Sequence, residues 1–239
     1  MSRAAGSTSP RLILLRHGEV ASHQGDIPLT AEGRRQAEAA GRVMAGQALG
    51  SVRLLSGATR RARESALGVR TGLTGADPAS PAAGPDVAFA LRNPDLYLAG
   101  VRVDLVSSSE AFAEQVPWLT AADVLAVPFY AEFLTAPDRI GCWLRHQAPP
   151  GDGAAEVARR IVAFAGSLGD QREARPDTVV AVTHSPVLRA VGIGLTGSDS
   201  GEPPYLNGFV VEMRPDGSAR AVPFDPFGTH PPSRSAAGE

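Results

Sequence analysis

The chain has 239 residues, 43% of them hydrophobic, and its formal net charge is −2 at pH 7. Such a length can bury a full core, and the small net charge gives no reason to expect nucleic acid or an anionic membrane as partner. The single cysteine, Cys142, excludes an intrachain disulfide, and no apolar run approaches the roughly 18 residues of a membrane helix. Because residues 1–10 also lack the apolar centre of a signal peptide, we expect a cytoplasmic protein.

The first predicted elements alternate between strands and helices. The apolar run RLILL (11–15) is typical of a central parallel strand. A helical pattern follows Thr30, a residue suited to the N-cap, with Glu32 in the first turn where the helix dipole favours an acid. Residues 52–56 (VRLLS) predict a second strand, and residues 58–70 predict a second helix.

The middle of the chain has a weaker pattern. Residues 74–86 (TGADPASPAAGPD) are rich in proline, glycine and alanine, as expected of a surface loop. From about 87 to 150 the periodicity is mixed, and we expect helices near 108–117 and 119–134. We interpret residues 74–150 as an inserted region of helices and loops.

The regular pattern returns in the C-terminal part. Residues 153–168 have one apolar helical face, and TVVAVTH (178–184) predicts another buried strand with a polar end. Pro186 suits the start of the next helix. Residues 206–213 predict a last strand, followed by a turn at 215–217 and a short edge strand.

This order of elements predicts an α/β fold, a three-layer α/β/α sandwich around a mostly parallel sheet. We expect one domain over residues 11–227, which contains the inserted region. Residues 1–10 and 228–239 are small, polar and proline-rich, and we expect them to be disordered tails. The stretch GIGLTG (192–197) matches the dinucleotide-binding pattern, but it lies at the expected end of a helix and indicates a C-cap and loop. No nucleotide cofactor is expected.

Polar residues follow two of the predicted buried strands. Arg16 and His17 end the first strand, and His184 ends the strand at 178–184. In parallel sheets ligands bind at the carboxyl ends of the strands, so we expect these side chains to meet. The helix that starts in SGATRRARESA (56–66) adds three arginines near its N-terminus, which also favours an anion, namely Arg60, Arg61 and Arg63.

The type of basic residue limits the reactions that are chemically feasible at this edge of the predicted sheet. The sequence contains no lysine, so all 23 basic residues are arginines. Phosphate binding by a Walker-type lysine and Schiff-base catalysis are therefore excluded. Arginines bind phosphate oxygens in bidentate fashion, and an imidazole held among them can attack phosphorus. The arginines supply charge stabilisation, so neither a metal nor a cofactor is expected.

Four motifs in this part of the sequence resemble a known family. RHGE (16–19) resembles the signature of the histidine phosphatase superfamily, which contains the phosphoglycerate mutase-like and acid phosphatase-like enzymes. DIPLTAEGRRQAEAAG (26–41), RARESA (61–66) and VVAVTHSPVLRAV (179–191) are similar to further motifs of the same superfamily, in the same order. The resemblance covers roughly residues 11–70 and 155–195.

The resemblance implies a phosphoglycerate mutase-like fold and a role for four residues. His17 would be phosphorylated transiently, and Arg16 and Arg61 would bind the phosphoryl oxygens. His184 would hydrogen-bond to the same group in the transition state. His23, His146 and His230 lie outside the motifs, and we expect none of them to take part.

The oxygen of the leaving alcohol needs a proton, and at the positions where the family carries the donating acid this sequence has other residues. Acid phosphatase-like members place an aspartate after the second histidine, where this chain has Ser185, and mutase-like members carry a glutamate where LRN (91–93) has Asn93. We select Glu110, because the serine run before it can cap a helix at the pocket. Asp95, Glu114 and Glu132 are the alternatives. An acidic leaving group would need no donor.

The sequence therefore predicts a metal-independent phosphatase that hydrolyses a small phosphomonoester through a phosphohistidine. Two alternatives stay open. The first is phosphoglycerate mutase-like transfer of the phosphoryl group to another hydroxyl. The second is a repurposed family member that binds an anionic ligand without phosphatase turnover. It is motivated by Asn93 and Ser185 and by the unfamiliar stretches LRNPDLYLAG and DSGEPPYL, of which the latter is a candidate wall of a pocket for a larger substrate.

Overall fold

The computed structural model describes residues 9–22, 25–75, 85–170 and 175–228. Most of the two expected tails and of the loop at 74–86 lie outside these ranges, as do His23 and His230. Among the described residues, no helix is long and apolar enough to span a membrane.

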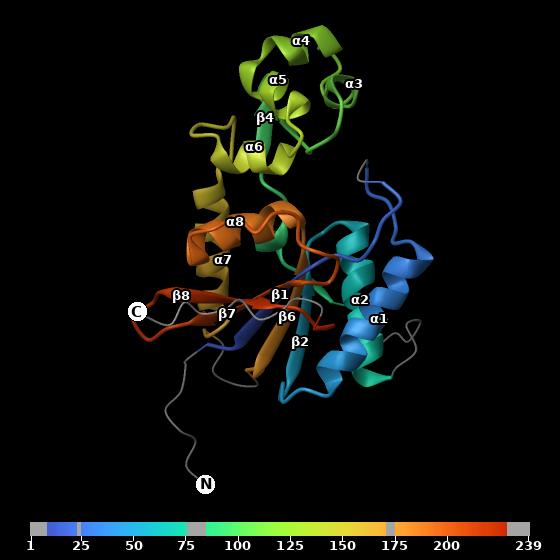
Figure 1. Ribbon diagram of the computed structural model, residues 1–239, viewed down its shortest axis with the longest axis vertical. Coiled ribbons are helices and arrows are strands. Elements are labelled where there is room, and N and C mark those ends of the chain that lie inside the picture. Colours follow the sequence, from blue (N-terminus) through green and yellow to red (C-terminus); the bar gives the residue numbers. More distant parts are fainter. Residues whose placement is uncertain (1–8, 23–24, 76–84, 171–174, 229–239) are drawn as a thin grey trace, which may run out of the picture.

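The described chain forms a six-stranded sheet in the order β3-β2-β6-β1-β7-β8 (Figure 1). Four neighbouring strands run parallel, namely β3 (Asp86–Val87), β2 (Val52–Ser56), β6 (Thr178–Thr183) and β1 (Arg11–Arg16). The antiparallel strands β7 (Gly208–Met213) and β8 (Ala219–Phe224) complete the other edge. The predicted mostly parallel sheet is confirmed.

Helices cover both faces of this sheet. Leu12 and Leu14 of β1 pack in one apolar cluster with α7 (Ala154–Ser167) and α8 (Ser185–Thr196). Ile13 and Leu15 point to the opposite face, where they pack with α1 (Ala31–Ala45) and α2 (Arg60–Thr74). All four β1 side chains are fully buried. Because successive side chains of a strand point to opposite faces of the sheet, helices pack on both faces, and this gives the three predicted layers (Figure 1).

The predicted starts and ends of several helices agree with their local contacts. The backbone N–H of Gly33 donates to Thr30 Oγ1 over 2.9 Å, so Thr30 caps α1. Pro186 lies in the first turn of α8. That helix ends at Thr196, and Gly197 adopts a left-handed conformation with φ 78°. The glycines of GIGLTG therefore lie in a helix and its C-cap, as predicted.

A lobe of short elements stands over the carboxyl ends of the parallel strands, at the top of Figure 1. This lobe, residues 94–150, is called the cap below. It consists of β4 (Leu96–Leu98), β5 (Val101–Val103), α3 (Ser109–Ala113), α4 (Ala121–Ala126), α5 (Pro128–Thr135) and α6 (Arg139–Arg145). Its large buried side chains include Phe112, Tyr130, Phe133 and Trp143, and they belong to the same apolar cluster as α7 and α8.

The cap differs from the sequence prediction in three ways. The hairpin β4–β5 and the helix α6 were not predicted, and the helix expected near 108–117 covers only Ser109–Ala113. The helix expected over 119–134 is two helices, which meet at Val127 and Pro128. The residue before a proline avoids the helical region, and Val127 is extended, with φ −86° and ψ 115°.

Candidate active site

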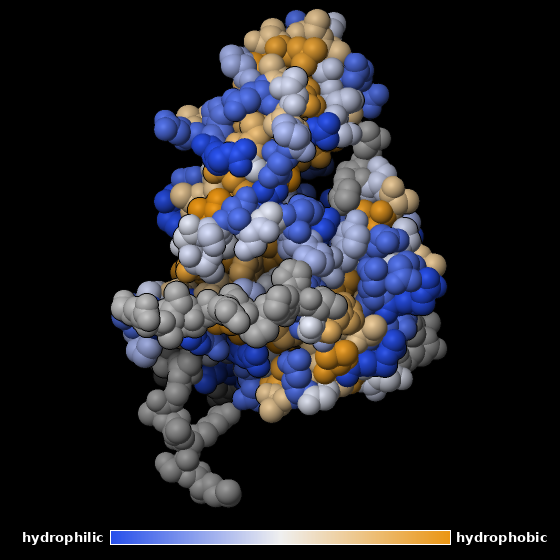
Figure 2. Space-filling model, viewed as in Figure 1, coloured by the Kyte–Doolittle hydropathy of each residue, from blue (hydrophilic) through white to orange (hydrophobic). Residues whose placement is uncertain are grey.

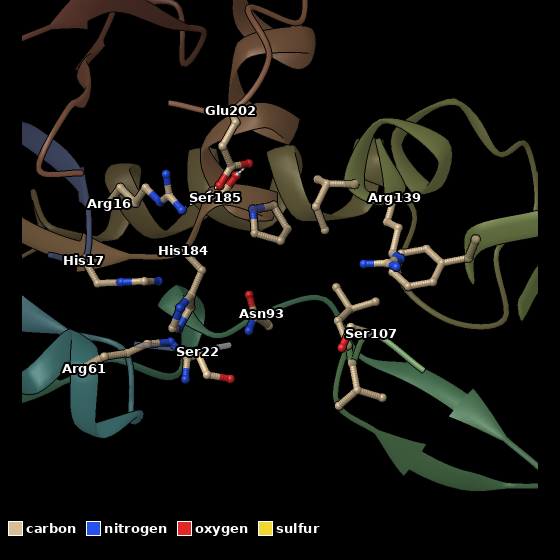
Figure 3. Close-up of a pocket in the computed structure, with 15 residues that line it drawn as sticks. Arg16, His17, Ser22, Arg61, Asn93, Ser107, Arg139, His184, Ser185 and Glu202 are labelled. Carbon is tan, nitrogen blue, oxygen red and sulfur yellow. Dashed lines mark hydrogen bonds and ion pairs between the residues drawn. The ribbon is translucent and has the colours of Figure 1, made fainter. Parts of the chain in front are cut away.

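The two predicted histidines lie together at the carboxyl ends of β1 and β6. Arg16 and Thr183 are partners in the parallel register of these strands, and His17 and His184 come directly after them. The centroids of the two imidazole rings are 5.5 Å apart, and each histidine is only 2% exposed. Both line a cavity of about 500 Å³ between the sheet and the cap (Figure 3). Neighbouring strands therefore bring together residues that are far apart in the sequence.

Backbone contacts fix the His17 ring. Its Nδ1 lies 2.8 Å from the carbonyl oxygen of Gly18, which can only accept a hydrogen bond. Nδ1 therefore carries the proton, and the lone pair of the neutral ring lies on Nε2. The N–H of Gly18 donates to Ser65 Oγ over 2.8 Å, and Ser65 Oγ donates to the Arg61 carbonyl over 2.7 Å. Helix α2 thus anchors the loop that carries His17.

The loop 198–207 holds Arg16 at the edge of the cavity. Arg16 Nη2 lies 2.6 Å from Glu202 Oε1, and Nη1 donates to the carbonyl of Pro203 over 2.5 Å. The guanidinium carbon stands 4.2 Å from the centre of the Tyr205 ring. These contacts occupy the end of the guanidinium group, while the Nε of Arg16 is buried and has no hydrogen-bond partner.

The three arginines at the start of α2 point in different directions. Arg60 is half exposed and pairs with Glu64 over 2.7 Å, and Arg63 is exposed. Arg61 is 7% exposed and lines the cavity beside the histidines (Figure 3). The backbone N–H of Arg60 donates to Asp26 Oδ1 over 2.5 Å, so a carboxylate already caps this helix. The side chain of Arg61, rather than the helix N-terminus, is what α2 offers to a ligand.

The charge of the cavity near the histidines is suited to an anion. Burial lowers the pKa of Arg16, and nearby Glu202 and Tyr205 offset part of this effect. Burial also lowers the pKa of Arg61, with Asp26 and Asp104 acting in the opposite direction. An arginine remains cationic despite such shifts. The Nε of Arg61 is a second buried donor without a hydrogen-bond partner, so two unsatisfied cationic donors border this cavity.

Glu110, the residue selected as proton donor, does not line this cavity. It lies in the first turn of α3 and is exposed to solvent. Its own backbone N–H and the hydroxyls of Ser108 and Ser109 lower the pKa of Glu110, whereas an acid catalyst needs a raised value. The serine run does cap the helix, through Ser108, and Ser107 of the same run lines the cavity, but Glu110 does not.

The three alternative acids are also absent from the cavity lining. Asp95 pairs with Arg92 over 2.6 Å and with Arg102 over 2.5 Å, and the bonds from these arginines help to lower the pKa of Asp95 against the opposing effect of burial. Glu114 lies at the C-terminal end of α3. Glu132 contacts the thiol of Cys142 over 3.7 Å.

The one carboxylate among the cavity-lining residues is Glu202, which the sequence analysis did not single out. Its Oε2 accepts a hydrogen bond from Ser185 Oγ over 2.5 Å, while its Oε1 contacts Arg16. The stretch DSGEPPYL contains Glu202 and reaches the cavity, as expected of a pocket wall. Ser185 directly follows His184, at the position where acid phosphatase-like members carry an aspartate. Through its hydrogen bond to Ser185, the Glu202 carboxylate therefore lies next to that position.

Asn93 also faces the cavity, and its Oδ1 is buried without a hydrogen-bond partner. Asn93 can therefore bind a ligand through its amide but cannot act as an acid. Within the described residues, no group of three histidine, cysteine or acidic side chains is arranged to hold a metal ion.

Comparison with known families and structures agrees with the sequence resemblance. The family model of the histidine phosphatase superfamily (branch 1) matches residues 12–78. No curated protein matches the chain significantly. The motif around His17, the helix α1 and Arg61 all lie within the matched segment. The resemblance to this superfamily is therefore confirmed.

Two solved structures illustrate the likeness in fold. One is a mycobacterial glucosyl-3-phosphoglycerate phosphatase complexed with VO₃, which is 22% identical, with a TM-score of 0.56; the match covers 90% of this chain and 97% of that one. The other is a mutant phosphoserine phosphatase from Entamoeba histolytica in complex with phosphoserine, which is 17% identical, with a TM-score of 0.53 and coverage of 89% and 95%. At these identities, the comparison establishes a shared fold.

Proposed function

We propose that this chain, which matches the histidine phosphatase superfamily in sequence and fold, hydrolyses a small phosphomonoester through a phosphohistidine on His17. One observation carries the proposal. Two buried imidazoles 5.5 Å apart share a cavity with two arginines whose Nε groups are buried donors without partners. A tetrahedral phosphoryl dianion satisfies both requirements, because it offers oxygens to the arginines and an electrophilic phosphorus to His17.

The proposed first step is attack by His17 on phosphorus. The hydrogen bond from Nδ1 to the Gly18 carbonyl leaves the lone pair on Nε2, and it also stabilises the positive charge that the ring gains as the N–P bond forms. Arg16, Arg61 and His184 bind the phosphoryl oxygens as the bond to the leaving oxygen breaks. Each charge-assisted hydrogen bond contributes about 1.5–3 kcal/mol, so these groups stabilise much of the developing charge.

We assign protonation of the leaving oxygen to Glu202, acting through Ser185, in place of Glu110. Glu202 Oε2 accepts a hydrogen bond from Ser185 Oγ, and both residues line the cavity, so a proton can pass between this carboxyl group and a bound leaving group. As the bond to phosphorus breaks, Ser185 Oγ gives its proton to the leaving oxygen and takes one from Glu202. The alcohol departs neutral, and Glu202 is left as a carboxylate.

The second step reverses this proton path. A water molecule attacks the phosphohistidine, and its proton passes through Ser185 to the Glu202 carboxylate. The N–P bond breaks, inorganic phosphate leaves, and His17 is again neutral. The same pair thus acts first as acid and then as base.

The test is a His17→Ala variant assayed with para-nitrophenyl phosphate and labelled with a radioactive phosphomonoester. Removal of the nucleophile should lower kcat by about 10³-fold or more and abolish the acid-labile phosphoenzyme. His146→Ala is the matched control, because His146 lies in the cap outside the cavity lining, and it should behave like wild type. Activity of His17→Ala within tenfold of wild type would overturn the proposal. Tight vanadate binding without labelling would identify an anion-binding protein instead.

A further inference from the structure

The cavity that contains the two histidines has a second charged end. Figure 3 shows Arg139 projecting from the cap toward the cavity, on the side opposite His17 and His184. Arg139 is the first residue of α6, and Ser107 lies near it, in the segment between β5 and α3. The sheet end holds the phosphoryl-binding residues, so a group bound at Arg139 must belong to the rest of the substrate.

Arg139 lacks the carboxylate partner that several other arginines of the chain have. Arg102 pairs with Asp95, and Arg160 pairs with Asp152 over 2.8 Å. Arg139 has no ion pair or side-chain hydrogen bond within the described chain, and its Nε is buried without a partner. A partly buried guanidinium that is left unsatisfied is costly, and an anionic ligand removes that cost.

The carboxylate next to Arg139 is not available to it. Asp138 accepts from Arg189 Nη1 over 2.8 Å and from Arg189 Nη2 over 2.6 Å. Asp138 also caps α6 by accepting from the N–H of Gly141 over 2.9 Å. These bonds fix the start of α6 and leave the charge of Arg139 for the cavity.

Apolar side chains separate the two charged ends. The walls between them are formed mainly by Leu105, Val106, Phe133, Ile140 and Pro186. The polar groups nearest to these walls are the amide of Asn93 and the hydroxyl of Ser107, whereas Ser22 lies beside Arg61 at the histidine end (Figure 3). A body covered with hydroxyls, such as a sugar, would lose hydrogen bonds to water along these walls, whereas an aromatic or aliphatic body would gain from burial. A cavity of about 500 Å³ is large enough for such a molecule.

From this arrangement we infer that the substrate is a phosphomonoester of a hydroxylated carboxylic acid with an apolar body, and that Arg139 binds the carboxylate. This inference rests on the proposed function for the identity of the phosphoryl end. It makes Arg139 a specificity residue, because its partner is a part of the substrate that does not react. Its effect should therefore fall on KM rather than on kcat.

The experiment compares 4-carboxyphenyl phosphate with phenyl phosphate in wild type and in Arg139→Met, which keeps the length of the side chain and removes its charge. We expect kcat/KM for the carboxylate ester to fall about 10- to 100-fold in the variant, mainly through KM. Phenyl phosphate should change less than twofold. Arg145→Met, on the same helix but outside this cavity, is the matched control and should leave both substrates unchanged.

A binding measurement separates failure of this inference from failure of the proposed function. Calorimetry with 4-carboxybenzylphosphonate and benzylphosphonate reports the carboxylate preference without turnover. A wild-type preference that disappears in Arg139→Met supports the inference even if no ester is hydrolysed, in which case only the proposed function fails. The inference is overturned if wild type shows no preference for the carboxylate, or if Arg139→Met weakens both phosphonates equally.

Discussion

The sheet and the cap border the same cavity but are built in different ways. Arg16 ends β1, and His17 and His184 directly follow β1 and β6, two strands that are buried along almost their whole length. The cap contributes Ser107, Phe133 and Arg139 from short helices and a loop. Strands in the middle of a sheet hold side chains in one geometry, whereas short helices can be exchanged without disturbing that sheet. Under the proposed function and the inference drawn from Arg139, the sheet performs the chemistry and the cap selects the substrate.

The space-filling view illustrates the same contrast on the surface. Hydrophobic side chains gather at the tip of the cap, whereas the outer side of α1, at the right of the view, is largely hydrophilic (Figure 2). Trp118, for example, is 65% exposed, while Trp143 is fully buried in the apolar cluster that the cap shares with α7 and α8. The cap is therefore held by a few large buried side chains, and these are where it should be most vulnerable.

Replacing Trp143 with alanine should have the largest effect on stability. Loss of a fully buried tryptophan costs about 3–5 kcal/mol in the free energy of unfolding, and it also leaves the Asp152 carbonyl without its 2.9 Å hydrogen bond. Urea denaturation followed by circular dichroism measures this change. Trp118→Ala is the matched control and should shift the unfolding free energy by less than about 0.5 kcal/mol.

The activity of the same variant tests the division of labour. Folded Trp143→Ala should keep most of the wild-type kcat for phenyl phosphate, because the reacting groups lie on the sheet. A kcat loss in the folded protein as large as that caused by removing a phosphoryl-binding arginine would contradict the contrast between the two regions.

Arg61→Ala should have the next largest effect, and it should affect catalysis. Removing one donor that stabilises transition-state charge lowers kcat by about 10²–10³-fold, which corresponds to roughly 2.7–4 kcal/mol. Arg63→Ala, on the exposed side of the same helix, should leave kcat unchanged. Steady-state kinetics with para-nitrophenyl phosphate measures both. Equal losses in the two variants would mean that Arg61 acts only through the overall charge of the helix.

The same contrast governed what the sequence could predict. The sheet and the helices that cover it come from long periodic segments, such as the fully buried β6, and their ends are marked by residues such as the N-cap Thr30 of α1. These elements were therefore predictable, and so was the proximity of His17 and His184. Helices of five to eight residues and strands of three are too short to show a hydrophobic periodicity in the sequence. For this reason α6 and the β4–β5 hairpin could not be predicted. The break between α4 and α5 is marked in the sequence by Pro128 itself.

The acid in the pocket could not be predicted for a different reason. Glu202 lies 186 positions after Arg16 in the chain, in a loop without periodicity. Leu206, near the end of that loop, adopts φ 62°, an uncommon conformation for leucine, and its N–H donates to the Arg16 carbonyl over 3.2 Å. Only the three-dimensional path of the loop brings Glu202 to Arg16. The capping pattern that favours Glu110 is present, but Glu110 itself is exposed and is not among the residues that line the cavity.

Glu202→Gln tests that reassignment. The amide keeps the size of the side chain but cannot give up a proton, so phosphorylation of His17 by an alkyl phosphate should slow by about 10²-fold or more. Pre-steady-state formation of the phosphoenzyme measures this step. With para-nitrophenyl phosphate the burst of nitrophenolate should slow less than tenfold, because nitrophenolate leaves without a proton.

Glu110→Gln is the control for this experiment, and it should match wild type on both substrates, since Glu110 is exposed outside the cavity lining. The reverse pattern, with loss in Glu110→Gln and none in Glu202→Gln, would restore the sequence prediction and require the cap to move onto the site.

The smallest effect is expected where the two regions join. Hydrogen bonds from Arg189 of α8 lower the pKa of Asp138, the N-cap of α6, to about 2, and bonds from the same arginine lower the pKa of Asp199. Because folding favours the ionised carboxylate, this stabilisation is complete above the ordinary aspartate pKa and is lost as the pH falls from about 4 to about 2. Asp138 is half exposed, so solvent screening keeps its share below about 1 kcal/mol.

Urea midpoints for wild type and Asp138→Asn, measured from pH 5 downward, should therefore converge as the pH approaches 2, and parallel curves would show that the ion pair contributes nothing. Arg139 follows Asp138 directly, so a looser start of α6 should also weaken the preference for 4-carboxyphenyl phosphate while hydrolysis of phenyl phosphate stays unchanged. Such a split would place the boundary between chemistry and substrate selection at the contact between α6 and α8, because the variant alters an ion pair between these two helices and leaves the residues at the ends of β1 and β6 in place.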